Sequence, residues 1–249
     1  MTDEATPRGD RDLTWDGCFN VRDLGGLPAG GGKRIRPGAV VRSDSIDNLT
    51  PAGWAALQAH GVMTVVDLRN DDERAADAGP RPLGLTTVHV PLDDVDFWAR
   101  MHREQRDGSP LYYRPFLTHK PERVAAAVTA VARAGPGGVL VHCAGGRDRT
   151  GLVTVLLLAV ADVPSDRIAA DNEASTVRLP PLFAKLGIPD ETAEIQTALD
   201  RHHTTIRAEI TGLLHQVDVN TYLRAAGVTA ADLHALRERL VGRAAGRET

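Results

Sequence analysis

Residues 139–151 have the sequence VLVHCAGGRDRTG. The run Val139–His142 is apolar and β-branched, which predicts a buried strand, and the glycines that follow predict a tight loop. From Gly151 to Val163 the chain is apolar on every side, which predicts a helix buried in the core. A buried strand that leads through a short loop into a buried helix is typical of a parallel α/β sheet.

Short apolar runs alternate with helical patterns on either side of this stretch, and after about Val163 only helical patterns follow. Region 93–119 is irregular, aromatic and charged, and we expect a surface excursion there. These patterns predict an α/β fold with a central, largely parallel sheet flanked by helices and a helical C-terminal third. The expected strands are Ala39–Arg42, Val62–Leu68, Thr87–Pro91 and Val139–His142. Helices are expected at 51–59, with Thr50 as the N-cap, at 151–163 and, as one long helix, at 190–214. Three further helices are expected to begin at Pro121, at Ser165 and after the N-cap Thr229.

Composition limits the class of protein. The chain has 249 residues, 42% of them hydrophobic and 25% charged, and a formal net charge of −4, which suits one large or two small globular domains and argues against a nucleic-acid partner. The longest apolar stretch, Leu152–Ala161, is about half of a membrane span. Because residues 1–17 lack the apolar core of a signal peptide, we expect a cytoplasmic protein, with leaderless secretion left open. The oligomeric state is not indicated by these patterns.

The loop after Val139–His142 carries the chemistry. Backbone N–H groups of such a loop converge on an anion, and the N-terminus of the following helix adds partial positive charge. Arg149 lies six positions after Cys143, so a loop bent around a phosphate brings a thiolate nucleophile and a bidentate guanidinium to one ligand. Thr150 is placed to donate a hydrogen bond to the departing thiolate, although a hydroxyl at a helix start is equally ordinary. No metal or cofactor is needed, because the loop supplies the electrophilic stabilisation. The alternative is that Cys143 is a small buried core residue.

Residues 142–151, HCAGGRDRTG, match the H-C-x5-R-[ST]-G signature of the protein tyrosine phosphatase superfamily. They resemble more closely the H-C-x-x-G-K-D-R-T-G loop of the atypical bacterial tyrosine phosphatases, also called the tyrosine/serine phosphatase family. Further similar segments are NVRDLGG at 20–26, Arg42-Ser43, DLRNDDE at 67–73 and YLRAAGV at 222–228. The resemblance implies a phosphate loop in which Ala144, Gly145, Gly146 and Arg147 bind substrate; Arg147 replaces the family's usual lysine.

The resemblance covers about residues 15–243 and implies one phosphatase domain between a flexible tail, 1–14, and a C-terminal tail, 244–249. It also suggests that helices in 172–214 form a lid over the catalytic mouth; an ordinary extension of the core is an equal alternative. The resemblance implies a cysteine-dependent phosphatase that forms a cysteinyl-phosphate and acts on phosphotyrosine in proteins, with dual specificity left open. The alternatives are a phosphoinositide phosphatase, a phospho-ligand binding module and a sulfurtransferase.

Several charged residues are candidates for support of the loop. Asp67, Arg69 and Glu73 follow a predicted strand, and the ligand site of a parallel sheet lies at the C-terminal ends of its strands. An ion-pair network that holds loops together is the favoured interpretation of these residues and of Asn20, Arg22 and Asp23. Arg42 stands at another strand end. His142 orients the loop by hydrogen bonding or is a satisfied buried histidine.

The leaving group needs a proton, and the W-P-D loop of eukaryotic tyrosine phosphatases is absent. Asp148 lies in the loop itself, where related lipid and bacterial phosphatases carry an aspartate. Arg147, Arg149 and the helix dipole favour its charged form, whereas a bound phosphate dianion favours protonation. The alternative general acids are Asp93, Asp94 and Asp96, which follow the third predicted strand. We favour Asp148 narrowly.

Overall fold

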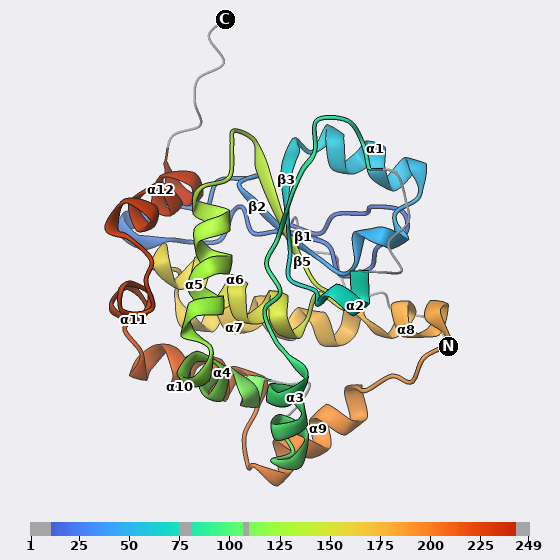
Figure 1. The fold of residues 1–249 in the computed structure, drawn as a ribbon, viewed down its shortest axis with the longest axis vertical. Helices are drawn as coiled ribbons and strands as arrows, with labels where there is room; N and C mark the ends of the chain where they lie inside the picture. The colour runs from blue at the N-terminus through green and yellow to red at the C-terminus, as the bar shows by residue number, and fades with distance from the viewer. Residues whose placement is uncertain (1–10, 75–80, 107–109, 243–249) are drawn as a thin grey trace, which may run out of the picture.

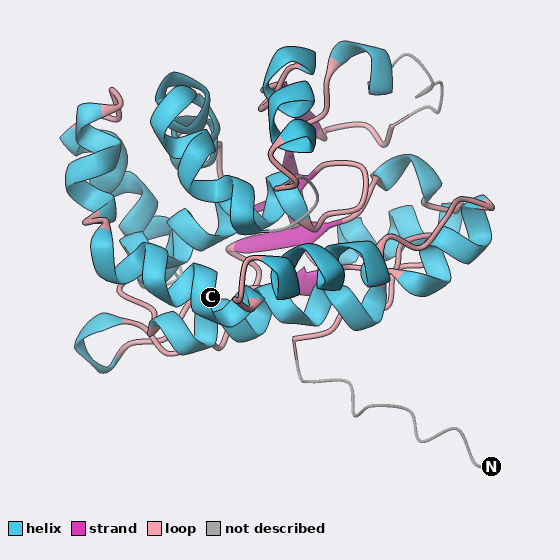
Figure 2. Ribbon diagram, turned by 90° about the horizontal axis from the view of Figure 1, so that it is seen from below, coloured by secondary structure: helices cyan, strands magenta, loops and turns pink. Residues whose placement is uncertain are grey.

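The computed structural model describes residues 11–74, 81–106 and 110–242. Within these residues a five-stranded sheet has the order β1-β2-β5-β3-β4. The pairs β2·β5, β5·β3 and β3·β4 are parallel, and only the edge pair β1·β2 is antiparallel. The expected α/β fold with a central, largely parallel sheet is confirmed, and helices surround the sheet in both views (Figures 1 and 2). The strands are β1 (Arg22–Asp23), β2 (Val40–Ser43), β3 (Val62–Asp67), β4 (Thr86–His89) and β5 (Gly138–His142).

The two faces of the sheet have different covers, because successive side chains of a strand point to opposite faces. Val139 and Val141 of β5 belong to the main core. This core holds residues of the helices α5 (Pro121–Ala132), α6 (Asp148–Val160), α11 (Val219–Ala225) and α12 (Ala230–Val241). Leu140 belongs to a smaller core with Trp15 and with Leu57 of α1 (Pro51–Ala59). The helix α6 is buried on every side, as its composition predicts, because it lies between the sheet and α7 (Ser165–Arg178).

The helices are α1 (Pro51–Ala59), α2 (Asp71–Arg74), α3 (Val95–Arg103), α4 (Tyr113–His119), α5 (Pro121–Ala132), α6 (Asp148–Val160), α7 (Ser165–Arg178), α8 (Pro180–Leu186), α9 (Thr192–Arg201), α10 (Ile206–Gln216), α11 (Val219–Ala225) and α12 (Ala230–Val241). The Thr50 side chain caps α1 by accepting from Gly53 N, and Thr229 caps α12 in the same way. None of the helices among these residues is long and apolar enough to span a membrane.

The helices differ from expectation in three regions. The irregular region 93–119 contains α3 and α4, whose apolar residues Phe97, Met101 and Phe116 are buried in the main core. The helix α6 begins at Asp148 rather than at Gly151. The expected long helix 190–214 is two helices, because His203 adopts a left-handed backbone (φ 52°) and Thr205 then caps α10.

The structured domain begins before the expected boundary at residue 15. Leu13 N donates to Val21 O, and the Arg11 guanidinium lies 2.9 Å from Asp171. Residues 11–14 are therefore part of the fold rather than of a tail. Residues 1–10 and the expected C-terminal tail 244–249 lie outside the described residues. In the expected lid region 172–214, α7 and α10 pack against each other, and Asn172, Ser175, Ile210 and Leu213 are buried, so only α8 and α9 remain candidates for a lid.

Candidate active site

The candidate nucleophile lies at the C-terminal end of the central strand β5. Cys143 follows this strand directly and is only 2% exposed. The loop then turns through Gly146, whose φ of +67° suits glycine, and a Cβ there would lie 2.2 Å from Ser43 O. No larger residue fits this approach without moving β2. At Asp148 the chain enters α6, so the N-terminus of this buried helix faces the loop.

Groups from outside the loop bind its carbonyl oxygens. Ser45 N donates to Ala144 O at 2.8 Å. The Asn20 Nδ2 group donates to Gly145 O at 2.9 Å, and Arg42 Nη2 donates to Gly146 O at 2.7 Å. Asn20 and Arg42 are fully buried. The loop backbone is therefore held by segments that are about one hundred residues or more away in sequence.

Arg149 is held by an acidic side chain from α2. Both Nη atoms of Arg149 bond the Glu73 carboxylate, with Nη2 at 2.6 Å from Oε1, and Nη1 lies 3.6 Å from Asp93 Oδ1. Although burial opposes it, the Glu73 hydrogen bonds and the charges of Cys143 and Asp93 raise the pKa of Arg149 well above its ordinary value. Arg149 is therefore a fixed cation beside the nucleophile. Glu73 bonds the two Nη atoms and not Nε, so this carboxylate leaves the Nε–H available to an oxyanion.

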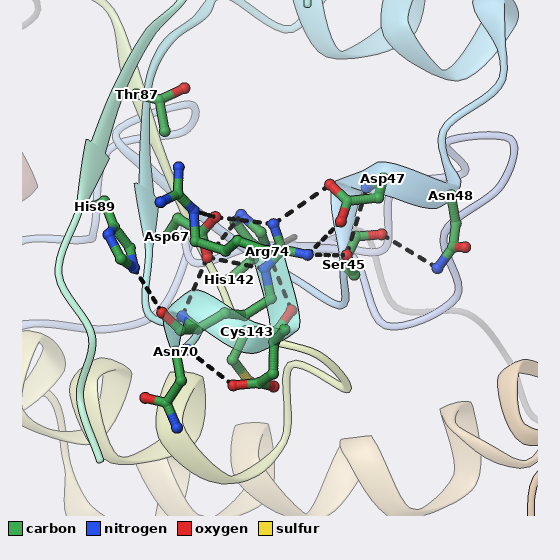
Figure 3. A network of polar contacts seen from close by, with 12 residues as sticks. Ser45, Asp47, Asn48, Asp67, Asn70, Arg74, Thr87, His89, His142 and Cys143 are labelled. Carbon is green, nitrogen blue, oxygen red and sulfur yellow. Dashed lines mark hydrogen bonds and ion pairs between the residues drawn. The ribbon is translucent and has the colours of Figure 1, made fainter. Parts of the chain in front are cut away.

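A buried carboxylate organises the segment around His142 (Figure 3). Asp67, at the end of β3, accepts from the Arg69 Nε and Nη2 atoms at 3.0 and 2.9 Å, and its Oδ1 lies 3.6 Å from His142 Nε2. Although burial opposes it, the hydrogen bonds and charge of the Arg69 guanidinium hold the pKa of Asp67 well below its ordinary value. Burial lowers the pKa of His142 to about 4, so this imidazole is neutral, and its Nδ1 lies 3.1 Å from Cys143 O. Asp67 and Arg69 thus form the expected ion-pair network, and it reaches the residue before the nucleophile.

The other loop side chains lie toward α9. Arg147 pairs with Asp148 at 3.3 Å and with Glu191, just before α9, at 2.9 Å. Asp148 also lines a cleft of about 570 Å³ together with residues of α3 and α9. Thr150 is fully buried, and its Oγ1 has no hydrogen-bond partner among the described residues. This orphaned hydroxyl, at the first turn of α6, suits the predicted role of a donor to the thiolate.

The three upstream aspartates are placed differently. Asp93 is buried beside Arg149, its Oδ2 accepts from Trp98 Nε1, and burial raises its pKa. Asp94 instead caps α3 and pairs with Lys120 at 2.6 Å. Asp96 is exposed in the first turn of α3. Of the three, the structure brings Asp93 to Arg149.

Asp23 binds a turn rather than the loop. Its carboxylate accepts from Gly25 N and Gly38 N at 2.8 and 2.7 Å, and it lies 3.1 Å from His60 Nε2. Arg22 lies behind the loop instead, where it bonds Asn20 and Asp171.

Two residues of this buried cluster are missing from the sequence-based prediction. Asp171 and Ser175 are on α7, are at most 1% exposed, and contact Arg22 and Arg42. Their one sequence signal is that they follow Ile168 at helical spacing, which places polar side chains on the buried face of a helix.

The arrangement combines a buried thiol, a fixed guanidinium, a helix N-terminus and two carboxyl groups. Anions bind at such a helix N-terminus, and a phosphorus centre held there lies in front of the sulfur. Within the described residues, no cluster of His, Cys, Asp and Glu has the geometry to hold a metal ion. The groups present therefore suit nucleophilic displacement at a phosphate ester.

A family model matches nearly the whole chain, and known phosphatases match large parts of it. Residues 13–242 match the model of the tyrosine phosphatase family. A Cupriavidus necator protein assigned provisionally as a tyrosine-protein phosphatase is 32% identical over 181 residues, which are 70% of this chain and 66% of that protein. The triple specificity protein phosphatase PtpB of Mycobacterium tuberculosis is 28% identical over 275 residues, covering 91% of this chain and 98% of that one. Among solved structures, P. aeruginosa TpbA matches with a TM-score of 0.37 and 18% identity over 84% of this chain and 91% of that chain.

The family match contains every element described above, from the segment before β1 to the end of α12. The family match agrees with the motifs around Cys143 and with the names of the bacterial relatives, which are phosphatases. The chain therefore belongs to the tyrosine phosphatase family and is similar to its bacterial members.

Proposed function

We propose that the chain is a cysteine-dependent protein-tyrosine phosphatase. The observation that carries the proposal is the meeting of Cys143, Arg149 and the N-terminus of α6 around one short loop. The family assignment favours hydrolysis over sulfur transfer and over binding of a phosphorylated ligand without turnover. The substrate is a phosphorylated protein.

The proposed reaction has two displacements. The Cys143 thiolate attacks phosphorus, the sulfur–phosphorus bond forms, and the bond to the tyrosine oxygen breaks while an acid protonates that oxygen. Water then attacks the phosphorus of the cysteinyl-phosphate and gives a proton to the acid residue that was deprotonated in the first step. The sulfur–phosphorus bond breaks, which releases inorganic phosphate and returns the thiolate. Arg149 and the helix N-terminus stabilise the charge on the phosphoryl oxygens in both steps, and Thr150 donates to the thiolate as it leaves.

A substrate panel tests the proposal. Phosphotyrosyl, phosphoseryl and phosphothreonyl peptides are compared with phosphoinositides, with Cys143→Ser as the inactive control. Turnover of phosphotyrosyl peptides that survives chelators is expected. Metal-dependent turnover, or no turnover of any phosphotyrosyl peptide, contradicts the proposal.

Broader specificity is a second candidate, supported by the name of the PtpB relative. A polyanionic head group needs cations beside the loop, and Arg147 is a candidate for that role. Its charge is already paired with Asp148 and Glu191. We therefore propose phosphotyrosine as the main substrate, and phosphoinositide turnover that exceeds phosphotyrosine turnover in the panel overturns this order.

We propose Asp148 as the general acid, because it belongs to the loop and lines an open cleft, whereas Asp93 is buried beside Arg149. Asp148→Asn is expected to slow an aryl phosphate with a poor leaving group more than one with an activated leaving group, and to flatten the basic limb of the kcat–pH profile. Asp93→Asn is the comparison variant. If only Asp93→Asn has this selective effect, Asp93 is the acid; the burial that raises its pKa suits that role.

We also propose that α8 and α9 form a lid over the loop. The ion pair between Arg147 and Glu191 links the loop to the start of α9. Ile195 and Leu199 of α9 pack with Leu111 in a small cluster apart from the main core, so α9 can move without disrupting that core. A closed lid excludes water and shields the thiolate from oxidants.

Glu191→Lys tests the lid by placing two like charges where the ion pair lies. An exposed ion pair contributes about 0–1 kcal/mol, so its loss shifts the equilibrium from the closed to the open lid by up to several-fold. We therefore expect a several-fold faster inactivation by peroxide and an altered KM. Glu238→Lys is the matched control, because it makes the same charge reversal at an exposed position on α12. Equal peroxide rates and KM values in parent, variant and control contradict the lid.

We also propose that the enzyme is located in the cytoplasm. Both cysteines, Cys18 and Cys143, are free thiols, which suits a reducing compartment such as the cytoplasm. Cell fractionation with an antibody to the chain tests it.

A further inference from the structure

We propose that Asn20 and Arg42 are positioning residues that orient the phosphate-binding amides of the loop from behind. Asp171 and Ser175 of α7 hold them in place. This inference rests on the proposed function, because it assumes that the loop binds the phosphoryl group.

The peptide planes of the loop are fixed through their carbonyl groups. The carbonyl groups of residues 144–146 accept hydrogen bonds from Ser45 N, Asn20 Nδ2 and Arg42 Nη2. In a planar trans peptide the carbonyl and the following N–H point in opposite directions. Holding these three carbonyls outward therefore turns the N–H groups of residues 145–147 toward the inside of the loop. No bond donated by those N–H groups is found among the described residues, so they remain for an oxyanion.

The orientation of the Asn20 amide is itself determined. Arg22 Nη1 donates to Asn20 Oδ1, and a guanidinium has no acceptor, so the amide oxygen must face Arg22. The Nδ2 group then faces Gly145 O, with Ser175 Oγ at 3.3 Å. A flipped amide would place two oxygens together at the loop. Arg22 thus acts on the loop through Asn20.

Arg42 is held in an equally fixed way. Its Nη1 lies 2.8 Å from Asp171 Oδ2 and 3.3 Å from Thr154 Oγ1, while Nη2 bonds the loop at Gly146 O. Although burial opposes it, Arg22 and Arg42 hold the pKa of Asp171 well below its ordinary value, so the carboxylate stays charged. Because Arg42, Asp171 and Asn20 are shielded from water, few alternative partners compete for their hydrogen bonds.

A purely structural role is the alternative, since a buried ion pair can hold a fold without affecting a site. The two roles differ in one observable. Loss of stability lowers the melting temperature and the active fraction, but the remaining folded molecules bind orthovanadate as before. Misdirected amides weaken vanadate binding and lower kcat of every folded molecule.

Asn20→Asp is the sharpest variant. The carboxylate has the shape of the amide and pairs with Arg22, but it cannot donate to Gly145 O. Because loss of one preorganised donor costs about 10²–10³-fold in rate, we expect at least a tenfold fall in kcat and a similar rise in the inhibition constant of orthovanadate. Asn220→Asp on α11 is the matched control. Asn220 Oδ1 also accepts a hydrogen bond from a guanidinium, that of Arg237, at 2.8 Å. The control is expected to keep both constants.

Arg42→Lys makes the same test where Asn20→Asp folds poorly. Lysine keeps the charge beside Asp171 but lacks the fork that also reaches Gly146 O. Its matched control is Arg237→Lys, since Arg237 bridges Asn220 and Val160 O. The inference is overturned if folded Asn20→Asp and Arg42→Lys keep the vanadate constant within twofold of the parent. An active Cys143→Ser variant, or a parent that vanadate does not inhibit, would instead overturn the proposed function.

Discussion

Replacement of Cys143 by serine is expected to abolish turnover of phosphotyrosyl peptides while the phosphate-binding loop keeps its shape. Serine is nearly isosteric with cysteine, so the buried position at the end of β5 is preserved. A serine hydroxyl does not ionise near neutrality, so the first displacement loses its nucleophile. Steady-state kcat with a phosphotyrosyl peptide measures the loss, and isothermal titration with the same peptide measures the retained binding.

Cys18→Ser is the matched control, because it makes the same change at the other free cysteine. Burial raises the pKa of Cys18 well above its ordinary value, and its Sγ lies 3.4 Å from Ser45 O. We expect this variant to remain active and sensitive to peroxide. A Cys143→Ser enzyme as active as the parent rules out the proposed nucleophile.

Replacement of Arg149 by lysine is expected to have the second largest effect. Lysine keeps one positive charge, but it cannot bond Glu73 and two phosphoryl oxygens with one planar group. By analogy with the loss of a preorganised oxyanion donor, we expect a loss of about 2–4 kcal/mol in transition-state stabilisation. This corresponds to a fall in kcat/KM of about 30- to 1,000-fold.

The kinetic pattern separates this role from simple ground-state binding. An interaction made mainly in the transition state lowers kcat and kcat/KM together, whereas uniform binding changes only KM. Arg207→Lys is a suitable control, since Arg207 also pairs with a glutamate, Glu173, but lies on α10. An Arg149→Lys enzyme within a few-fold of the parent kcat/KM contradicts the role of Arg149.

The core of the site could be predicted because its information is local. Cys143 and Arg149 are six positions apart on one loop, and the apolar runs on either side predict the strand β5 and the helix α6. Turn and cap residues predict α1 and α12 for the same reason. Each of these signals operates within a few residues of the feature that it predicts.

Contacts between distant segments could not be predicted in this way. The Glu73 carboxylate meets Arg149 across 76 positions, and Asp171 meets Arg42 across 129. The start of α6 was also predicted too late, because the prediction followed the apolar run from Gly151, whereas the helix begins with the charged residue Asp148. Gly151 does not mark an end of this helix. It is instead a close approach inside the helix, where a Cβ would lie 2.4 Å from Tyr113 Oη.

The prediction of an irregular surface excursion over region 93–119 is wrong. Charged residues are so frequent there that the apolar pattern of two amphipathic helices is hard to recognise. In α3, Phe97 and Met101 are four residues apart and buried, while arginine and histidine occupy the outer face. The aromatic residues Phe97, Tyr112 and Phe116 then pack against one another. Packing of these aromatic rings stabilises α3 and α4, although the apolar residues of the two helices form only a weak periodic pattern in the sequence.

The proposed reaction requires that Cys143 carries the phosphoryl group during turnover. A phosphotyrosyl peptide is mixed with the enzyme, the reaction is quenched in acid within milliseconds, and the digested protein is analysed by mass spectrometry. We expect one phosphoryl group on the peptide that contains Cys143, and none in Cys143→Ser. A phosphoryl group on another residue, or turnover with no phosphorylated enzyme at any quench time, would contradict the claim.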